Sequence, residues 1–265
     1  MITAPAKQSV PMLKMDNISK YYGGEETLAP LSLSINKGET VAVIGPSGAG
    51  KTTLLNILGT IVQPDRGQVL INGMSSKNLK PGRQLSRMVG VMHQQLDLIG
   101  QLSVINNVLA GRLGEWGLLR SLLSLIIPQE KALAVKALER VGIPEKLYQK
   151  TSRLSGGEQQ RVAMARILVQ QPQAILADEP ISSLDPTRAV DILSMLVNFS
   201  RENGQTLVVS LHSVEYALQY FNRIIALRHG KIFFDRPANQ VTREDMDQLF
   251  QIEEEANERC KPWPA

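Results

Sequence analysis

The chain has 265 residues, of which 43% are hydrophobic, and its formal net charge is +4. This length and apolar content suffice for a large domain with a substantial core, so disorder is not expected. The single cysteine, Cys260, excludes an intrachain disulfide and a cysteine-based zinc site, and it fits a reducing compartment. The charge is mildly basic without a dense lysine and arginine run, which gives no support for nucleic-acid binding.

The sequence offers no segment of its own for crossing a membrane. The lead-in of residues 1–11 has no apolar core of the kind found in secretory signals. The longest strongly apolar run, residues 117–128, is interrupted by Arg120 and is too short to span a bilayer. Any membrane association is therefore expected to depend on a partner.

Apolar, β-rich runs predict the first strands of the chain, at residues 13–18, 31–35, 40–44, 69–71 and 88–92. The run TVAVI at 40–44 has the unbroken apolar character of a parallel strand that is buried on both faces. A glycine-rich turn follows it, and helical spacing resumes over 51–58. The local order is therefore strand, turn, helix.

Helical patterns dominate from residue 103 to 169, and strand character then returns at 174–177, 206–210 and 224–227. Pro128 is predicted to open a helix that Gly142 closes. A helix is expected from Pro186 to about Asn203, and a capping box at 242–245 opens a last helix before the tail of 246–265. Strands that alternate with helices predict a parallel sheet with covered faces.

Residues 45–52 read GPSGAGKT and match the phosphate-loop pattern G-x-x-x-x-G-K-[ST] between a buried strand and a helix. Glycines allow a sharp turn that aims N–H groups at phosphate oxygens, Lys51 suits the β and γ phosphates, and the Thr52 hydroxyl suits Mg²⁺. An ordinary glycine-rich turn does not explain the strand, lysine and threonine together. The predicted ATP contacts of this segment are Gly45, Pro46, Ser47, Gly48, Ala49, Gly50, Lys51, Thr52 and Thr53.

Two carboxylates, Asp178 and Glu179, follow the apolar strand at 174–177. Ligands of open sheets bind at the carboxyl ends of strands, so Asp178 suits a Mg²⁺ contact there. Glu179 could polarise a water for attack on a γ-phosphate as general base. Alone, such a pair is more often a helix cap, but beside a phosphate loop it predicts catalysis.

Between these motifs, residues 154–161 read LSGGEQQR, which resembles the signature of the ATP-binding cassette (ABC) family. The resemblance covers residues 12–245. It implies the α/β fold of a P-loop NTPase, with a RecA-like parallel sheet, an antiparallel β subdomain and an inserted α-helical subdomain at about 96–168. It also implies that the chain binds and hydrolyses ATP.

The signature also reads as a second anion site, because Ser155 and the N–H groups of Gly156 and Gly157 begin a helix. A serine-capped helix explains the same residues equally well locally. The family resemblance alone implies that Ser155, Gly156, Gly157 and Glu158 meet the nucleotide of a second cassette. It therefore predicts a homodimer or a pair with a related cassette.

The resemblance assigns further roles. Tyr22 would stack on adenine, with Tyr21 as the alternative. Gln94, with Gln95 as the alternative, would sense Mg²⁺ and water, and His212 would contact the γ-phosphate. The predicted catalytic set is Lys51, Gln94, Glu179 and His212, and the predicted Mg²⁺ ligands are Thr52, Gln94 and Asp178. Residues 183–185 resemble the loop that crosses the dimer interface, where Asp185 could also cap the next helix.

Two stretches resemble the ATPases of phosphonate importers: the segments 107–114, 121–123 and 137–143 in succession, and residues 209–217. This predicts a peripheral ATPase on the cytoplasmic face of a bacterial inner membrane, with permease subunits as partners, a periplasmic solute-binding protein as an indirect one, and no nucleic acid. Phosphate, phosphite, amino-acid and lipoprotein-release or efflux systems, and a soluble cassette, stay as alternatives. Residues 111–127 are either a docking surface for the permease or a helical connection with a buried apolar face.

Overall fold

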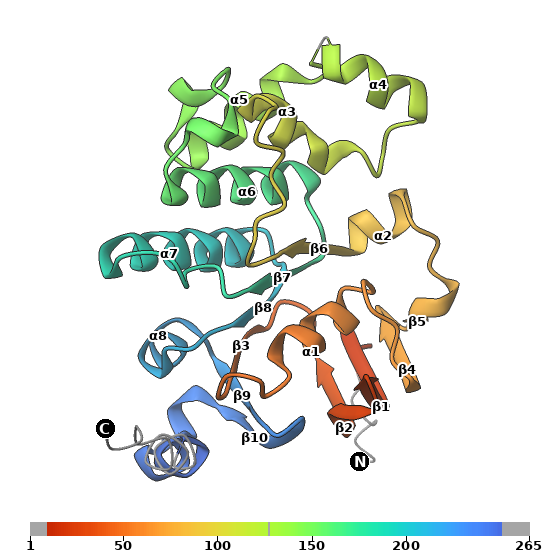
Figure 1. Cartoon of the computed structure of the whole chain (residues 1–265), viewed down its shortest axis with the longest axis vertical. Coiled ribbons are helices and arrows are strands. Elements are labelled where there is room, and N and C mark those ends of the chain that lie inside the picture. Colours follow the sequence, from red (N-terminus) through yellow and green to blue (C-terminus); the bar gives the residue numbers. More distant parts are fainter. Residues whose placement is uncertain (1–9, 127, 251–265) are drawn as a thin grey trace, which may run out of the picture.

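The computed structural model describes residues 10–126 and 128–250, which form a mixed sheet, a smaller antiparallel sheet and a group of helices at one end (Figure 1). Cys260 and most of the predicted lead-in and tail lie outside the described residues. Across the described ranges, no helix is both long enough and apolar enough to cross a bilayer.

The larger sheet has the strand order β10-β9-β3-β8-β7-β6. All its neighbours pair in parallel except β10, which runs antiparallel to β9 at the edge. The predicted parallel sheet is therefore confirmed, whereas β10 was missed. The strands are β3 (Thr40–Ile44), β6 (Val89–Met92), β7 (Ala174–Asp178), β8 (Thr206–Ser210), β9 (Arg223–Arg228) and β10 (Lys231–Pro237).

Strand β3 is buried on both faces, as its unbroken apolar run predicts. Ala42 and Ile44 belong to a core that continues into the helices of the insert. Val41 and Val43 face the other way, into a core shared with the smaller sheet. The strand that leads into the phosphate loop is thus held by packing from two sides.

The smaller sheet has the order β2-β1-β4-β5, and its described pairs are antiparallel. Its strands are β1 (Leu13–Tyr22), β2 (Glu25–Ile35), β4 (Arg66–Ile71) and β5 (Met74–Ser75). Strand β2 begins at Glu25, well before the predicted Leu31, because a hairpin pairs Tyr22 with Glu25. The irregular register between β1 and β2 hides the early half of this strand from a simple alternation pattern.

Helices of the insert follow β6 in the chain, precede β7 and lie together at one end of the molecule (Figure 1). They are α3 (Val104–Leu109), α4 (Leu118–Ile126), α5 (Lys131–Arg140) and α6 (Gly156–Gln170). The other helices are α1 (Lys51–Leu58), α2 (Arg83–Met88), α7 (Pro186–Glu202), α8 (Val214–Tyr220) and one over 243–250. Single 3₁₀ turns occur at η1 (Ser76–Asn78), η2 (Ala110–Arg112), η3 (Pro144–Lys146), η4 (Thr151–Arg153) and η5 (Ala238–Gln240).

The prediction that Pro128 opens a helix is wrong, since α5 begins at Lys131. The preceding residue, Glu130, is left-handed with φ of 56°. Its carboxylate accepts hydrogen bonds from Arg112 Nε at 3.1 Å and Arg120 Nη2 at 2.7 Å. These two cations stabilise a turn at Glu130, so the helix begins only after it.

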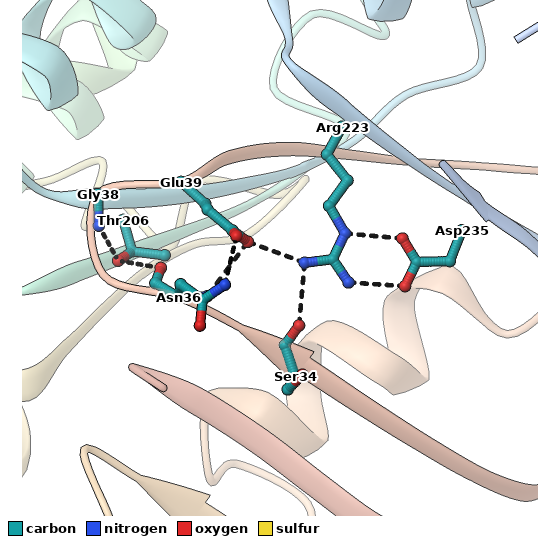
Figure 2. A network of polar contacts seen from close by, with 7 residues as sticks. All are labelled: Ser34, Asn36, Gly38, Glu39, Thr206, Arg223 and Asp235. Atoms are coloured by element: carbon teal, nitrogen blue, oxygen red, sulfur yellow. Dashed lines mark hydrogen bonds and ion pairs between the residues drawn. The ribbon is translucent and has the colours of Figure 1, made fainter. Parts of the chain in front are cut away.

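Arg223 joins the two sheets at the amino ends of the parallel strands (Figure 2). Its Nε and Nη2 atoms donate to the two Asp235 oxygens at 2.7 and 2.6 Å. Its Nη1 donates to Glu39 Oε2 at 2.8 Å and to the Ser34 carbonyl at 3.0 Å. The hydrogen bonds to Asp235 are the main cause of a raised Arg223 pKa. One guanidinium therefore connects β9, β10, β2 and the loop that enters β3.

Replacing Arg223 with methionine should lower the free energy of unfolding by about 2 kcal/mol, because two partly buried carboxylates would lose their shared cation. The side chain of Arg223 is only 23% exposed. Urea unfolding followed by circular dichroism measures the change.

The matched control is Arg140→Met. The Arg140 side chain is 50% exposed where it pairs with Glu202. Its loss should cost less than about 1 kcal/mol. Equal effects of the two substitutions would contradict a special role for the Arg223 network.

Candidate functional site

The predicted phosphate loop connects β3 to α1, and close packing requires glycine at two of its positions. Gly45 has φ of 150°, and a Cβ there would lie 2.1 Å from the Leu227 carbonyl oxygen. Gly50 has φ of 98°, and a Cβ there would lie 2.6 Å from Leu28 Cδ2. The loop is therefore tightly packed between β9 and β2, in a conformation that side chains at these two positions would prevent.

Lys51 begins α1 and is buried. Its Nζ donates hydrogen bonds to the carbonyls of Gly45 at 2.8 Å and Pro46 at 3.0 Å. The first turn of α1 contains no acidic residue. A buried cation and the amino end of a helix together create a region of positive potential that suits an anion.

A pocket of about 400 Å³ contains the residues that are predicted to be catalytic. Gln94 follows β6, Glu179 follows β7 and His212 follows β8, so each stands just beyond the carboxyl end of a parallel strand. The pocket is lined by Thr27, Ser47, Gly48, Ala49, Gly50, Lys51, Thr52, Thr53, Gln94, Glu179 and His212. All four predicted catalytic residues thus line one cavity, while Gly45 and Pro46 lie outside its lining.

The Glu179 carboxylate is held from both sides. Gln94 Nε2 donates to its Oε2 at 3.2 Å, and His212 Nε2 lies 2.5 Å from its Oε1. The backbone of Glu179 is left-handed, with φ of 46°, and its N–H donates to Ser210 Oγ at 2.9 Å. The backbone of Glu179 is therefore strained, and its carboxylate is held by hydrogen bonds beside a region that suits an anion. This is the placement that a general base needs.

A second pocket, of about 330 Å³, contains the three predicted metal ligands. Thr52, Gln94 and Asp178 all line it. Asp178 is buried and accepts a hydrogen bond from Ser210 Oγ at 2.6 Å. Hydroxyl, amide and carboxylate oxygens are the donor set that Mg²⁺ prefers. Among the described residues, no cluster of three or more His, Cys, Asp and Glu side chains offers a competing metal site.

The predicted signature residues lie elsewhere. Ser155 caps α6 in a reciprocal capping box: its Oγ accepts from Glu158 N at 3.3 Å, and its N–H donates to Glu158 Oε2 at 2.8 Å. The Ser155 N–H and Lys146 hold the Glu158 pKa below its usual range. Ser155 and Gly156 are exposed, and none of residues 155–158 lines either pocket described above. The structure therefore does not bring the signature to the phosphate loop of its own chain.

The two tyrosines at the end of β1 differ in their contacts. The Tyr21 hydroxyl donates to Glu26 Oε1 at 2.8 Å, and its N–H donates to Asp65 Oδ2 at 2.7 Å. Tyr22 is 48% exposed, with Lys20 Nζ 5.3 Å from its ring centroid. Tyr21 is thus engaged in the hairpin, while more of the Tyr22 ring faces solvent. Neither ring lines the phosphate-loop pocket.

Asp185 lies on an exposed loop and caps α7, since its Oδ1 accepts from Arg188 N at 3.1 Å. This is the capping role that the sequence predicted as one option. Ser183 is also exposed, whereas Leu184 is partly buried against the core. The loop therefore presents polar groups to solvent beside Glu179.

Sequence reasoning missed Arg166, which lies in α6 within the apolar run 162–169. Its Nη2 and Nη1 donate to the carbonyls of Leu96 at 2.8 Å and Asp97 at 3.0 Å. Both of these residues are left-handed, with φ of 58° and 47°. Burial lowers the Arg166 pKa. Arg166 therefore connects the signature helix to the loop that carries Gln94, and a lone arginine in an apolar helical run was the available signal.

Arg166→Met should loosen this loop, because two strained residues would lose the donor that holds their carbonyls. Amide hydrogen exchange in peptides covering 94–98 should accelerate roughly tenfold or more, with smaller changes in the central sheet.

Arg153→Met, at an exposed position in η4, is the control and should leave exchange in 94–98 unchanged. Equal protection of the loop in Arg166→Met and the unsubstituted protein would refute the connection.

Comparisons with known proteins identify the family of the chain. The family model described as ABC transporter matches residues 28–182. The chain is 44% identical to the phosphonates import ATP-binding protein PhnC of Anaeromyxobacter dehalogenans, over 91% of this chain but only 48% of that relative. It is 42% identical to PhnC 3 of Halalkalibacterium halodurans, over 90% of this chain and 94% of the relative.

A solved structure adds to these matches. The dimeric post-hydrolysis state of the ATP-binding cassette MJ0796, bound to ADP and Pi, is similar with a TM-score of 0.72 and 32% identity. The match covers 86% of this chain and 99% of that one.

Proposed function

The chain belongs to the ABC transporter family, and from this premise we propose that it is the ATP-hydrolysing subunit of an import complex for phosphonates or a related phosphorus oxyanion. The observation that carries the proposal is the pocket in which Lys51, Gln94, Glu179 and His212 meet. The substrate class rests on the names of the relatives, which are phosphonate import proteins.

The predicted site residues have separate parts in ATP binding and hydrolysis. Lys51 binds the β and γ phosphates in place of the loop carbonyls, and the backbone N–H groups of the loop hold their oxygens. Glu179 accepts a proton from the attacking water, and His212 and Gln94 orient its carboxylate. Thr52, Gln94 and Asp178 would hold Mg²⁺, and the bound ion would neutralise part of the phosphate charge. Tyr22 offers its exposed ring to the adenine.

The site is completed by a second cassette. Ser155, Gly156, Gly157 and Glu158 do not line the phosphate-loop pocket of their own chain, and Ser155 and Gly156 at the amino end of α6 are exposed. A head-to-tail pair of chains would place this helix end against the partner's nucleotide. The dimeric relative MJ0796, whose structure contains ADP and Pi, supports this arrangement.

Glu179→Gln should lower the ATP turnover rate by at least about 100-fold, because an amide cannot accept the proton of the attacking water. Equilibrium binding of a fluorescent ATP analogue should be retained. The substituted protein should elute as a dimer with ATP in size-exclusion chromatography.

Lys51→Ala separates binding from chemistry, because it removes the cation that meets the phosphates. It should lose ATP affinity by about tenfold or more. Substantial residual hydrolysis in Glu179→Gln would overturn the general-base role, and unchanged ATP affinity in Lys51→Ala would overturn the role of the loop.

The exposed face of α4 supports a permease as the membrane partner. Leu118, Leu119, Leu122 and Leu123 lie on one face of this helix, and Leu119 is 85% exposed. Exposed apolar stripes of this kind are typical of protein interfaces. Docking on a permease would place the chain at the cytoplasmic face of a bacterial inner membrane, with the solute-binding protein on the other side.

The double substitution Leu119→Ser and Leu122→Ser should abolish copurification with the permease encoded alongside this chain, because the interface would lose its apolar anchors. Hydrolysis by the isolated subunit should stay unchanged. Pull-down from detergent extracts measures the first effect and phosphate release the second.

Leu218→Ser, on the exposed side of α8, is the control and should leave copurification intact. Retained binding of the α4 double variant would place the permease contact elsewhere. Uptake of radiolabelled methylphosphonate by the reconstituted complex, compared with phosphate, tests the substrate class.

A further inference from the structure

Ser210, the last residue of β8, occupies a position between the two carboxylates of the site. Its hydroxyl donates to Asp178 Oδ1 at 2.6 Å and accepts from the Glu179 N–H at 2.9 Å. The residue is fully buried. A single hydroxyl group thus contacts both residues for which a metal-binding and a proton-accepting role are proposed.

Ser210 lies where the ladder between β7 and β8 ends. Asp178 and Ser210 are the last paired residues of the β7–β8 ladder. On its other side β8 stays bound to β3, since Leu211 N donates to the Val43 carbonyl at 3.0 Å. The Glu179 N–H, one residue beyond the end of β7, donates to the Ser210 hydroxyl.

The turn at Glu179 is costly for a residue with a side chain, because its φ is 46°. Such a conformation persists only when neighbouring groups stabilise it. The hydrogen bond from its N–H to Ser210 stabilises this conformation directly. It thereby fixes the backbone position from which the Glu179 side chain extends. The hydrogen bond to Asp178 at the same time restricts which oxygen of that carboxylate faces the pocket.

We propose that Ser210 is a positioning residue for ATP hydrolysis, which orients Asp178 toward the metal-binding pocket and Glu179 toward the attacking water through one shared hydroxyl. This inference rests on the proposed function. This positioning role requires a side-chain group that donates one hydrogen bond and accepts another, so serine and threonine can perform it and alanine cannot.

The test compares Ser210→Ala with Ser210→Thr and with Ser200→Ala. Ser200 is the matched control because it is also fully buried and its hydroxyl also makes a hydrogen bond, to the Val197 carbonyl of α7 at 2.8 Å. Both alanine substitutions remove one buried hydroxyl, but only that of Ser210 touches the site. Three quantities are measured: the turnover rate, ATP-analogue affinity with and without Mg²⁺, and amide hydrogen exchange at Glu179.

In Ser210→Ala the turnover rate should fall about tenfold, the size expected for the loss of one hydrogen bond to a charged group. ATP affinity without Mg²⁺ should stay within about twofold, because the phosphate loop is intact. The gain in ATP affinity on adding Mg²⁺ should shrink, because Asp178 loses the hydrogen bond that orients it. Exchange of the Glu179 amide should accelerate. Ser210→Thr should restore all three quantities, and Ser200→Ala should leave them unchanged.

Unchanged turnover, Mg²⁺ gain and exchange in Ser210→Ala would overturn the proposal, as would a folded Ser210→Thr that fails to restore them. If the added methyl of threonine prevents folding, exchange at Glu179 in Ser210→Ala decides alone: acceleration supports the proposal and wild-type protection overturns it. Failure of the proposed function is distinguishable, since it would appear as absent ATP turnover in the unsubstituted protein, whereas high turnover in Glu179→Gln would overturn only the general-base role.

Discussion

The pairing of β8 between β3 and β7 is the constraint on which the site depends. Parallel pairing brings the carboxyl ends of these strands to one edge, so the loop after β3 and the residues after β7 and β8 must lie close together. Burial of β3 on both faces holds this edge in place. Residues more than 100 positions apart in sequence therefore share one pocket.

The same architecture keeps the predicted signature residues out of the phosphate-loop pocket of their own chain. The signature helix α6 belongs to the insert, and its exposed amino end does not line the phosphate-loop pocket. Arg166 on that helix nevertheless holds the carbonyls of Leu96 and Asp97, close behind Gln94. Movement of α6 would therefore be transmitted to the loop that contacts Glu179. A partner that engages the amino end of α6 could in this way influence the proposed general base of the same chain.

Sequence alone predicted the parts of the site that are contiguous or that end a strand. The phosphate loop is a run of neighbouring residues, and Asp178 is identifiable because an apolar strand precedes it. The sequence did not predict the roles of Ser210 and Arg166, because these roles depend on hydrogen bonds to backbone groups that are distant in sequence. The start of α5 was misplaced for a similar reason, since distant arginines stabilise the turn at Glu130. Strand β10 was missed because its pairing with β9, rather than a strong apolar alternation, defines it.

The charges of the pocket explain why it favours a phosphate anion over other ligands. A buried ammonium must keep hydrogen-bond partners, and the Gly45 and Pro46 carbonyls provide them for Lys51. These neutral acceptors are weaker partners than a charged phosphate oxygen, so an incoming anion can replace them with a net gain. The Glu179 carboxylate in the same pocket is kept in place by Gln94 and His212. A buried cation at the amino end of a helix thus gives the loop a positive potential that suits the negative charge of a nucleotide.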